Sequence, residues 1–479
     1  MKKILFVGAE VMPFAATGGL GDVLGSLPAA MKKEYKDDID IRVVMPLYDT
    51  ISDEWKSQMT LEAVFNLNLS WRNLYCGIKR LVKDGVIYYF IDNEYYFKRG
   101  TLYGQFDDGE RYAYFCKAAI EMLSVINFYP DVLHAHDWQA ALSLAYLNFN
   151  YRWRREYQNI KTVFTIHNIE YQGKYSFDIL GNVFGFEDSS RGYLEYDGCI
   201  NLMKCAIEMA NAVTTVSPRY ADEIKGEEHS HGLSPILNRN AHKLSGILNG
   251  IDYDYYNPEN DPVIPQKFSS DSVDKKSVNK TELQKSIGLP VRADVPMIAI
   301  ISRLATHKGL DLVRDVAYRV LDNYDAQFVV LGKGEADYEN FFIGLEHNRN
   351  DKARALIKYD RDLSKKIYAA ADLFVMPSKS EPCGLSQMIA SRYGAIPIVR
   401  ETGGLFDSIK GYWLRDGEIL GNGFTFYNYS SEELYDRICA ALELYYDKEL
   451  YARFVKKIME TDFSWSVSAR KYNELYSRI

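Results

Sequence analysis

The sequence predicts an α/β protein with two doubly wound, Rossmann-like domains that face each other across a cleft. Short apolar strands alternate with helix-like segments along most of the chain, which is typical of parallel sheets. At 479 residues the chain is too long for a single core, so more than one domain is expected. The tetrapeptide Thr-Gly-Gly-Leu occurs twice, at 17–20 and 402–405, each time between an apolar strand and a helix.

Composition and charge exclude several classes of protein. The chain is 47% hydrophobic and 25% charged, which is ordinary for a globular protein, and its formal charge of -8 argues against nucleic acid as a partner. No stretch reaches the roughly 18 to 20 apolar residues of a membrane span. Six cysteines without a CxxC pair predict neither a zinc site nor a disulfide framework, so a cytoplasmic protein is expected. The 37 tyrosines suit stacking on sugar rings, but ordinary packing is the simpler explanation.

The first series of strands and helices predicts an N-terminal domain over residues 1–255. Residues 61–91 interrupt the series with antiparallel strands, because apolar and polar residues alternate there and Asp84-Gly85 is a hairpin turn signal. The other expected strands are 3–8, 41–45, 131–137, 162–167, 212–216 and 244–248, and the expected helices are 23–33, 113–125 and 202–210.

A second series predicts a C-terminal domain over residues 256–460. Three X-Pro pairs and a Ser/Lys/Asp-rich run at 269–280 indicate a linker and the outer edge of this domain. The expected strands are 297–301, 327–331, 354–357, 373–376 and 396–399. Amphipathic helices are expected at 434–446 and 455–476, and the last of these forms a separate C-terminal segment, 461–479.

The two glycine loops predict anion binding. Glycines between a strand and a helix let backbone N–H groups approach a ligand, and the helix dipole favours a phosphate there. Ligands of such sheets lie beyond the carboxyl ends of the strands, so the cleft between the domains is the expected site. A dehydrogenase is disfavoured, because Met45-Pro46 stands where a dinucleotide-binding unit needs an acidic residue for the ribose.

Charged residues follow two strands of the second domain. Arg303 and Lys308 lie five residues apart across a strand-to-helix turn, where both can reach one diphosphate and stabilise it as a leaving group without a metal. Glu381 follows the strand at 373–376, where its carboxylate can bind sugar hydroxyls or offset positive charge on an oxocarbenium-like centre; stabilising a helix dipole is the alternative.

Histidines end two strands of the first domain. His134, His136 and Asp137 form an H-x-H-D run, but no third ligand is evident, so no metal site is expected. His167 ends the next strand, and such a lone histidine is more often structural than catalytic.

Across nearly its full length the chain resembles bacterial glycogen synthases and plant starch synthases, which are retaining glycosyltransferases of the two-domain GT-B fold. The matching stretches are Thr17-Gly18-Gly19-Leu20 with Asp22-Val23, His134-Ala135-His136-Asp137-Trp138, Thr165-Ile166-His167-Asn168, Tyr171-Gln172-Gly173, Thr215-Val216-Ser217-Pro218, Leu248-Asn249-Gly250-Ile251-Asp252, Ser302-Arg303-Leu304, Lys308-Gly309, Ala371-Asp372-Leu373-Phe374, Pro377-Ser378, Glu381-Pro382-Cys383-Gly384-Leu385, Thr402-Gly403-Gly404-Leu405 and Phe463-Ser464-Trp465.

The resemblance implies transfer of glucose from ADP-glucose to the non-reducing end of an α-1,4-glucan such as glycogen, with retention of configuration and no cofactor. It implies catalytic roles for Glu381, His167, Arg303 and Lys308. It places the donor against Gly18, Gly19, Tyr359, Cys383, Gly384, Leu385, Thr402, Gly403, Gly404 and Leu405, and the glucose and acceptor side at Asp22, Asp137, Trp138 and Asn249. The N-terminal domain would hold the glucan, the C-terminal domain the nucleotide sugar, and the final helix would pack back on the first domain.

Two positions depart from the family pattern. Ile389 replaces a second glutamate found in related glycosyltransferases, as in many glycogen synthases. Ala16 stands where the family normally has a lysine before Thr-Gly-Gly-Leu. Two alternatives therefore stay open: a retaining glycosyltransferase of the same fold with UDP-glucose or another acceptor, and a weakly active glucan-binding homologue.

Overall fold

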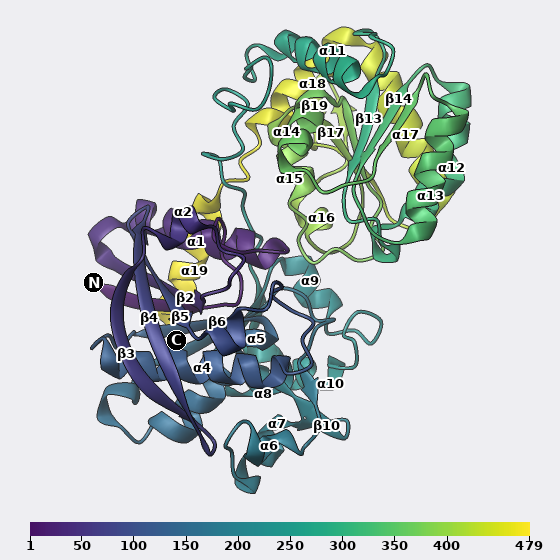
Figure 1. Cartoon of the computed structure of the whole chain (residues 1–479). Helices are drawn as coiled ribbons and strands as arrows, with labels where there is room; N and C mark the ends of the chain where they lie inside the picture. Colours follow the sequence, from purple (N-terminus) through teal and green to yellow (C-terminus); the bar gives the residue numbers. More distant parts are fainter. The chain divides into compact units, whose positions relative to one another are not determined.

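A computed structural model describes residues 1–479, which divide into two units (Figure 1). The first unit contains Met1–Asn249 and Trp465–Ile479, and the second contains Gly250–Ser464. Each unit is built on a mostly or wholly parallel sheet, so the predicted two-domain α/β class is confirmed. None of the helices has both the length and the apolar composition needed to cross a bilayer.

The first unit contains a nine-stranded sheet in the order β12-β11-β7-β6-β1-β2-β5-β4-β3. Its strands are β1 (Lys2–Val7), β2 (Ile39–Pro46), β3 (Thr60–Leu69), β4 (Arg72–Lys83), β5 (Val86–Asp92), β6 (Val132–His136), β7 (Lys161–Ile166), β11 (Ala212–Thr215) and β12 (Leu244–Gly246). A small antiparallel sheet adds β8 (Lys174–Tyr175), β9 (Glu195–Tyr196) and β10 (Cys199–Asn201). Strands β12 to β5 run parallel, and β4 and β3 are antiparallel, which confirms the predicted interruption.

The turn between β4 and β5 has the conformation that its sequence demands. Asp84 has φ 51° and Gly85 has φ 75°, and the two residues join strands whose register pairs Lys83 with Val86. A two-residue hairpin loop needs positive φ at both positions, which is why Asp-Gly is a strong turn signal.

The helices of the first unit include the last segment of the chain. The longer ones are α1 (Gly19–Tyr35), α4 (Asp108–Val125), α5 (Asp137–Tyr146), α8 (Leu202–Met209) and α19 (Trp465–Arg478), and the short ones are α2 (Asp53–Lys56), α3 (Glu94–Phe97), α6 (Ile179–Asn182), α7 (Arg191–Leu194), α9 (Pro218–Glu223) and α10 (Ser234–Arg239). The yellow α19 packs on the purple α1, and its Tyr472 and Tyr476 are buried (Figure 1). The final helix thus returns to the first domain, as predicted.

The second unit is built on a fully parallel six-stranded sheet in the order β15-β14-β13-β16-β17-β20. Its strands are β13 (Met297–Ile301), β14 (Gln327–Leu331), β15 (Ala353–Leu356), β16 (Leu373–Met376), β17 (Ile396–Arg400) and β20 (Phe424–Phe426), with a separate hairpin of β18 (Trp413–Arg415) and β19 (Glu418–Leu420). The helices are α11 (Lys276–Ile287), α12 (Leu310–Asn323), α13 (Ala336–Asn348), α14 (Arg361–Ala370), α15 (Ser386–Arg392), α16 (Gly403–Ser408), α17 (Ser431–Tyr446) and α18 (Lys448–Glu460).

The polar run predicted as a linker contains part of a helix, α11. Two of its lysines are buried, which a polar composition does not suggest. Lys276 Nζ donates to the carbonyls of Tyr368 and Ala369 at the end of α14, and Lys280 Nζ lies 2.6 Å from Asp372 Oδ2. Lysines near the carboxyl end of another helix satisfy its unpaired carbonyls, so α11 packs through charged side chains and shows no apolar stripe.

The helix predicted over residues 455–476 is interrupted. The chain leaves the helical conformation between α18 and α19, where Ile251 N donates to Phe463 O at 2.8 Å. A strand-like bridge between Ile251 and Ser464 accompanies this bond. The two crossing segments satisfy each other's backbone groups at this point, which helical hydrogen bonding in 461–464 would prevent.

Candidate active site

The centre of the candidate site is Glu381, which follows β16 in the second unit. Its side chain is buried, and its Oε2 lies 2.6 Å from Lys308 Nζ. Ser378 Oγ donates a second hydrogen bond to the same oxygen at 3.1 Å. The sequence proposed Glu381 and Lys308 separately for the sugar and the diphosphate, and the structure joins them in one ion pair.

The turn that carries Lys308 is held against the loop after β16. Gly309 has φ 70°, and a Cβ there would lie 2.1 Å from the carbonyl oxygen of Pro377. Lys379 N also donates to His307 O at 2.9 Å. Only glycine permits this approach of two backbones, so the Lys308-Gly309 pair fixes the position of the ammonium group relative to Glu381.

Arg303 lies on the same turn and adds a second cation. Its guanidinium NH2 lies 3.4 Å from His307 Nε2. Glu335 accepts hydrogen bonds from Thr306 N and Oγ1, which lower the pKa of its carboxyl, and Arg303 and His307 contribute to that shift. The turn therefore carries two cations. Lys308 is paired with the buried carboxylate of Glu381, and Arg303 is exposed to solvent, where its guanidinium can bind a diphosphate.

The glycines of the second Thr-Gly-Gly-Leu loop contact protein backbone. A Cβ on Gly403, which has φ 44°, would lie 2.0 Å from Glu381 O, and a Cβ on Gly404 would lie 2.1 Å from Cys383 O. Gly404 N donates to the carbonyls of Glu381 and Pro382, both at 3.1 Å. The resemblance assigns these glycines to the donor, and the structure shows that both also pack against the Glu381–Cys383 backbone.

Gln387 is a residue of this site that sequence reasoning missed. Its Nε2 donates to Gly384 O at 2.8 Å, to Ser408 Oγ at 2.9 Å and to Cys383 O at 3.2 Å. It therefore ties the loop after β16 to α16. Thr402, Cys383 and Leu405 are buried, whereas Tyr359 is 82% exposed.

The first Thr-Gly-Gly-Leu loop is built differently. A Cβ on Gly18 or Gly19 would meet nothing within 4 Å, so this face of the loop is open. Gly18 N donates to Glu10 Oε2 at 3.1 Å, and the same oxygen accepts from Thr17 N. The N–H of Gly18 thus binds protein, and the donors that a helix start leaves unpaired begin at Gly19.

Glu10 was also missed, although it organises this loop. Its side chain is buried, and its Oε1 accepts hydrogen bonds from Thr17 Oγ1 at 2.9 Å and from the Tyr103 hydroxyl at 2.6 Å. A buried carboxylate needs such donors to offset its desolvation. Thr17 itself is held by both its N–H and its hydroxyl, so the loop has a fixed backbone despite its exposed glycines.

The strand-end histidines form a buried network. His136 Nδ1 lies 2.9 Å from His167 Nε2, and His134 joins the Tyr476 hydroxyl at 2.7 Å to Thr165 Oγ1 at 2.6 Å. Burial lowers the pKa of His134 and His136 well below the ordinary value and that of His167 to about 3. All three rings are therefore neutral near pH 7.

The unpaired ring nitrogen of His136 determines the tautomers of His136 and His167. His136 Nε2 is buried without a partner. An unpaired buried N–H is rarer in proteins than an under-satisfied acceptor, so His136 carries its proton on Nδ1 and donates it to His167 Nε2. His167 then carries its own proton on Nδ1, where a neutral N–H is left to contact a ligand.

Replacing His136 by glutamine should change how stability depends on pH. Below about pH 6.5 His136 is protonated in the unfolded chain and stays neutral in the folded chain. Through this residue the free energy of unfolding therefore falls by about 1.4 kcal/mol per pH unit. The difference in unfolding free energy between the two proteins should therefore narrow by that amount per unit from pH 6 to pH 4.5. Urea unfolding at several pH values measures it, with the exposed His242→Gln as control; a constant difference would contradict this role.

Asp137 connects the two strand ends. It begins α5 directly after β6, where the sequence predicted a strand, and its φ of 56° is tolerated by aspartate. Its Oδ1 accepts the backbone N–H of His167 at 2.7 Å, and burial raises the pKa of its carboxyl to about 7. Asp137 thus fixes the backbone of His167, while His136 fixes its ring.

The other residues proposed for the acceptor side lie in the first unit. The Trp138 ring contacts Tyr112 edge-on at 5.3 Å, and a Cβ on Gly173, at φ 66°, would lie 2.8 Å from the indole. Asn249 is buried, and its Oδ1 has no hydrogen-bond partner. Asp22 lies in the first turn of α1. Of these, the amide oxygen of Asn249 is the clearest vacant acceptor.

The chain is similar to known proteins over nearly its full length. The family model described as the starch synthase catalytic domain matches residues 3–239, and the model for glycosyl transferases group 1 matches residues 282–460. The chain is 46% identical to a glycogen synthase of Streptococcus mutans over 480 residues, covering all of both proteins. It is 45% identical to one of Clostridium perfringens, covering all of this chain and 98% of the relative.

Solved structures show the same similarity. The catalytic domain of starch synthase IV from Arabidopsis thaliana, bound to ADP and acarbose, superposes with a TM-score of 0.91 at 36% identity, covering 100% of this chain and 99% of that one. A sucrose-phosphate synthase from Thermosynechococcus elongatus superposes at 0.61 and 15% identity, over 100% of this chain and 99% of that one, and shows a shared fold alone.

Proposed function

The chain belongs to the family of glycogen and starch synthases, retaining glycosyltransferases that extend a glucan, and we propose that its donor is ADP-glucose. The acceptor in this proposal is the non-reducing end of an α-1,4-glucan. The observation that carries the proposal is the ion pair between the buried Glu381 carboxylate and Lys308, on a turn that also carries Arg303. The ADP in the related starch synthase structure supports the choice of nucleotide.

The donor residues act on the charges that develop as the glycosidic bond breaks. Negative charge accumulates on the diphosphate, and Arg303 and Lys308 stabilise it as a planar fork and a point charge. Positive charge accumulates at the anomeric carbon, where the carboxylate of Glu381 offsets it. Without donor, Lys308 neutralises Glu381 at 2.6 Å, so the ammonium that receives the diphosphate also keeps the buried carboxylate paired.

The first unit supplies the neutral hydrogen-bonding groups. The Nδ1–H of His167 donates to a sugar oxygen, and the vacant amide oxygen of Asn249 accepts from a hydroxyl. Asp137 and Trp138 complete the glucose and acceptor side, and Gly18 and Gly19 leave an open face for the donor. Tyr359 packs on the adenine in this proposal, and its 82% exposure leaves its ring available. The six cysteines are free thiols, which suits a reducing cytoplasm.

Ala16 favours a second candidate, a weakly active homologue, and a substitution separates the two. Ala16→Lys should raise kcat/KM for the donor about 10- to 100-fold, because a charge-assisted contact is worth about 1.5–3 kcal/mol. Ala16 is partly exposed and lies two residues before the open Gly18-Gly19 face. Steady-state kinetics with ADP-glucose and UDP-glucose on glycogen measure the effect.

Ala16→Met is the matched control, since it adds a side chain of similar length without charge. It should leave kcat/KM near that of the unsubstituted chain. If only UDP-glucose were consumed, the donor assignment would be wrong. If both the unsubstituted chain and Ala16→Lys bound glycogen without turnover, the hypothesis of a weakly active glucan-binding homologue would replace the proposal.

A further inference from the structure

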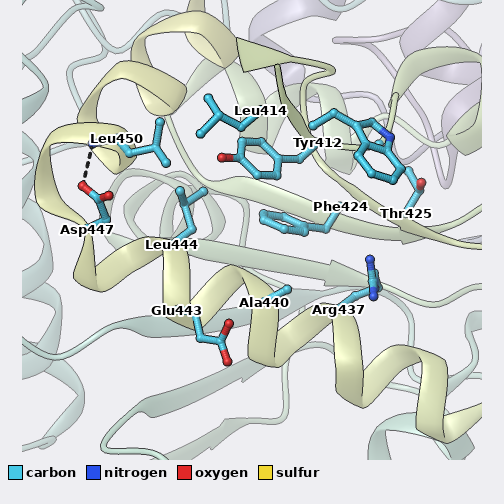
Figure 2. Close-up of a pocket in the computed structure, with 12 residues that line it drawn as sticks. Tyr412, Leu414, Phe424, Thr425, Arg437, Ala440, Glu443, Leu444, Asp447 and Leu450 are labelled. Atoms are coloured by element: carbon cyan, nitrogen blue, oxygen red, sulfur yellow. Dashed lines mark hydrogen bonds between the residues drawn. The ribbon is translucent and has the colours of Figure 1, made fainter. Parts of the chain in front are cut away.

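A pocket with a volume of about 520 Å³ lies in the second unit, and none of its residues belongs to the candidate active site (Figure 2). It is formed between β18 with the two residues before it, β20, and helices α17 and α18. Its volume falls within the range of small-molecule sites. The chemistry of its lining indicates the class of ligand.

One side of the pocket is aromatic. The rings of Tyr412 and Phe424 lie 5.3 Å apart and are backed by Phe454, 5.0 Å from Tyr412. Trp413 also lines the pocket and is 73% exposed. The cluster of Tyr412, Phe424 and Phe454 holds the start of the hairpin in place, so the indole is presented on a supported backbone. An indole face that is open to solvent and sits beside a pocket provides a stacking surface.

The other side of the pocket is polar. Arg437 and Glu443 line the pocket from α17, and neither has a hydrogen-bond or ion-pair partner within the protein. Asp447 accepts the N–H of Leu450 at the start of α18, as the dashed line in Figure 2 shows. With two carboxylates and one guanidinium, the lining has no excess of positive charge to attract a phosphate or a nucleotide. A neutral polyhydroxylated ligand does not need this excess of positive charge.

We propose that this pocket binds an α-glucan chain at a site separate from the active site. The apolar faces of the glucose rings stack on Trp413, and the hydroxyl edges bond to Arg437 and Glu443. The proposal rests on the proposed function for the identity of the glucan. A second contact with a polymer that carries many chain ends raises the effective concentration of those ends near the enzyme. The pocket thereby raises the affinity of the enzyme for glycogen without taking part in the transfer of glucose.

The test compares long and short acceptors. Trp413→Ala and Arg437→Met should each weaken retention in glycogen-containing gels and raise KM for glycogen, by about tenfold for Trp413→Ala. Their kcat/KM with a short malto-oligosaccharide primer should stay unchanged. Trp153→Ala removes an equally exposed indole, 71% exposed, from the first unit and is the control that should change neither measurement.

Arg437 has no partner to lose, so its variant tests the pocket even if Trp413→Ala folds poorly. Glycogen affinities equal to that of the unsubstituted chain in both variants would overturn the proposal. The proposal would also be overturned if the variants changed oligomeric state in size-exclusion chromatography while their affinity for glycogen stayed unchanged. The hairpin would then be an interface between copies of the chain. Gel retention needs no turnover, so it is measured even if no donor is consumed and the proposed function fails.

Discussion

Glu381→Gln is expected to lower kcat by about 100- to 1,000-fold, with a smaller change in KM for the donor. Glutamine keeps the size of the side chain and removes the negative charge that Lys308 Nζ contacts at 2.6 Å. The loss falls on kcat because the charge at the sugar carbon develops only in the transition state. Initial rates across a range of ADP-glucose concentrations measure both constants.

Ser378→Ala is the control for this variant. It removes the hydroxyl that donates to Glu381 Oε2 at 3.1 Å and leaves the carboxylate paired with Lys308. We expect a loss of about tenfold or less, the size of one neutral hydrogen bond. If Glu381→Gln kept more than a tenth of the activity while remaining folded, the carboxylate would have no electrostatic role in transfer.

Gly404→Ala is expected to abolish most of the activity and to lower the unfolding free energy by about 1–3 kcal/mol. Its new Cβ would lie 2.1 Å from Cys383 O, so α16 and the loop after β16 must move apart. That movement displaces Glu381, whose carbonyl oxygen also accepts the N–H of Gly404 at 3.1 Å. A 1 Å error in placing a catalytic group costs about 100-fold in rate. Thermal unfolding and activity measured on the same sample separate the two effects.

The matched control is Gly19→Ala, in the other copy of the same tetrapeptide. Its Cβ would meet nothing within 4 Å, so the variant should fold with the stability of the unsubstituted chain. A ligand that approaches the open face would meet the new methyl group, so the change should appear in KM for the donor. If Gly19→Ala destabilised the protein as much as Gly404→Ala, the two loops would not differ in the way described.

The sheets were predictable because their strands are apolar on both faces. Strands such as β1, β7 and β14 are short apolar runs that helices cover, and the pattern alone reveals them. Helix α11 was not predictable in the same way. Its buried lysines pair with carbonyls of α14 and with Asp372, and these partners lie about ninety residues along the chain.

The charged residues of the candidate site were predictable from the sequence, and the residues that hold the site's loops in place were not. Glu381, Arg303 and Lys308 carry recognisable chemistry at strand ends. The roles of Glu10 and Gln387 depend in part on contacts with Tyr103 and Ser408, which the local sequence does not reveal. Glu10 meets the Tyr103 hydroxyl, 93 positions along the chain. An acidic residue that breaks an apolar run directly after a buried strand was the one available hint, because it must find donors when buried.

The two copies of the tetrapeptide show that a sequence motif alone does not determine what its residues contact. Both copies follow a strand and begin a helix, which made them equivalent in sequence. In the structure Gly403 and Gly404 are close-packed against the Glu381–Cys383 backbone, while Gly18 and Gly19 face open space. The neighbours of each loop decide the difference, and they come from the loop after β16 in one case and from Glu10 in the other.

The most direct test of the central claim follows radiolabelled glucose from ADP-glucose into glycogen. We expect the purified chain to incorporate the label and Glu381→Gln not to do so. We also expect an exo-acting amylase specific for α-1,4 links to release the label as maltose, which locates it at non-reducing ends with retained configuration. Failure to label glycogen, or label that resists this digestion, would contradict the assigned donor or the assigned linkage.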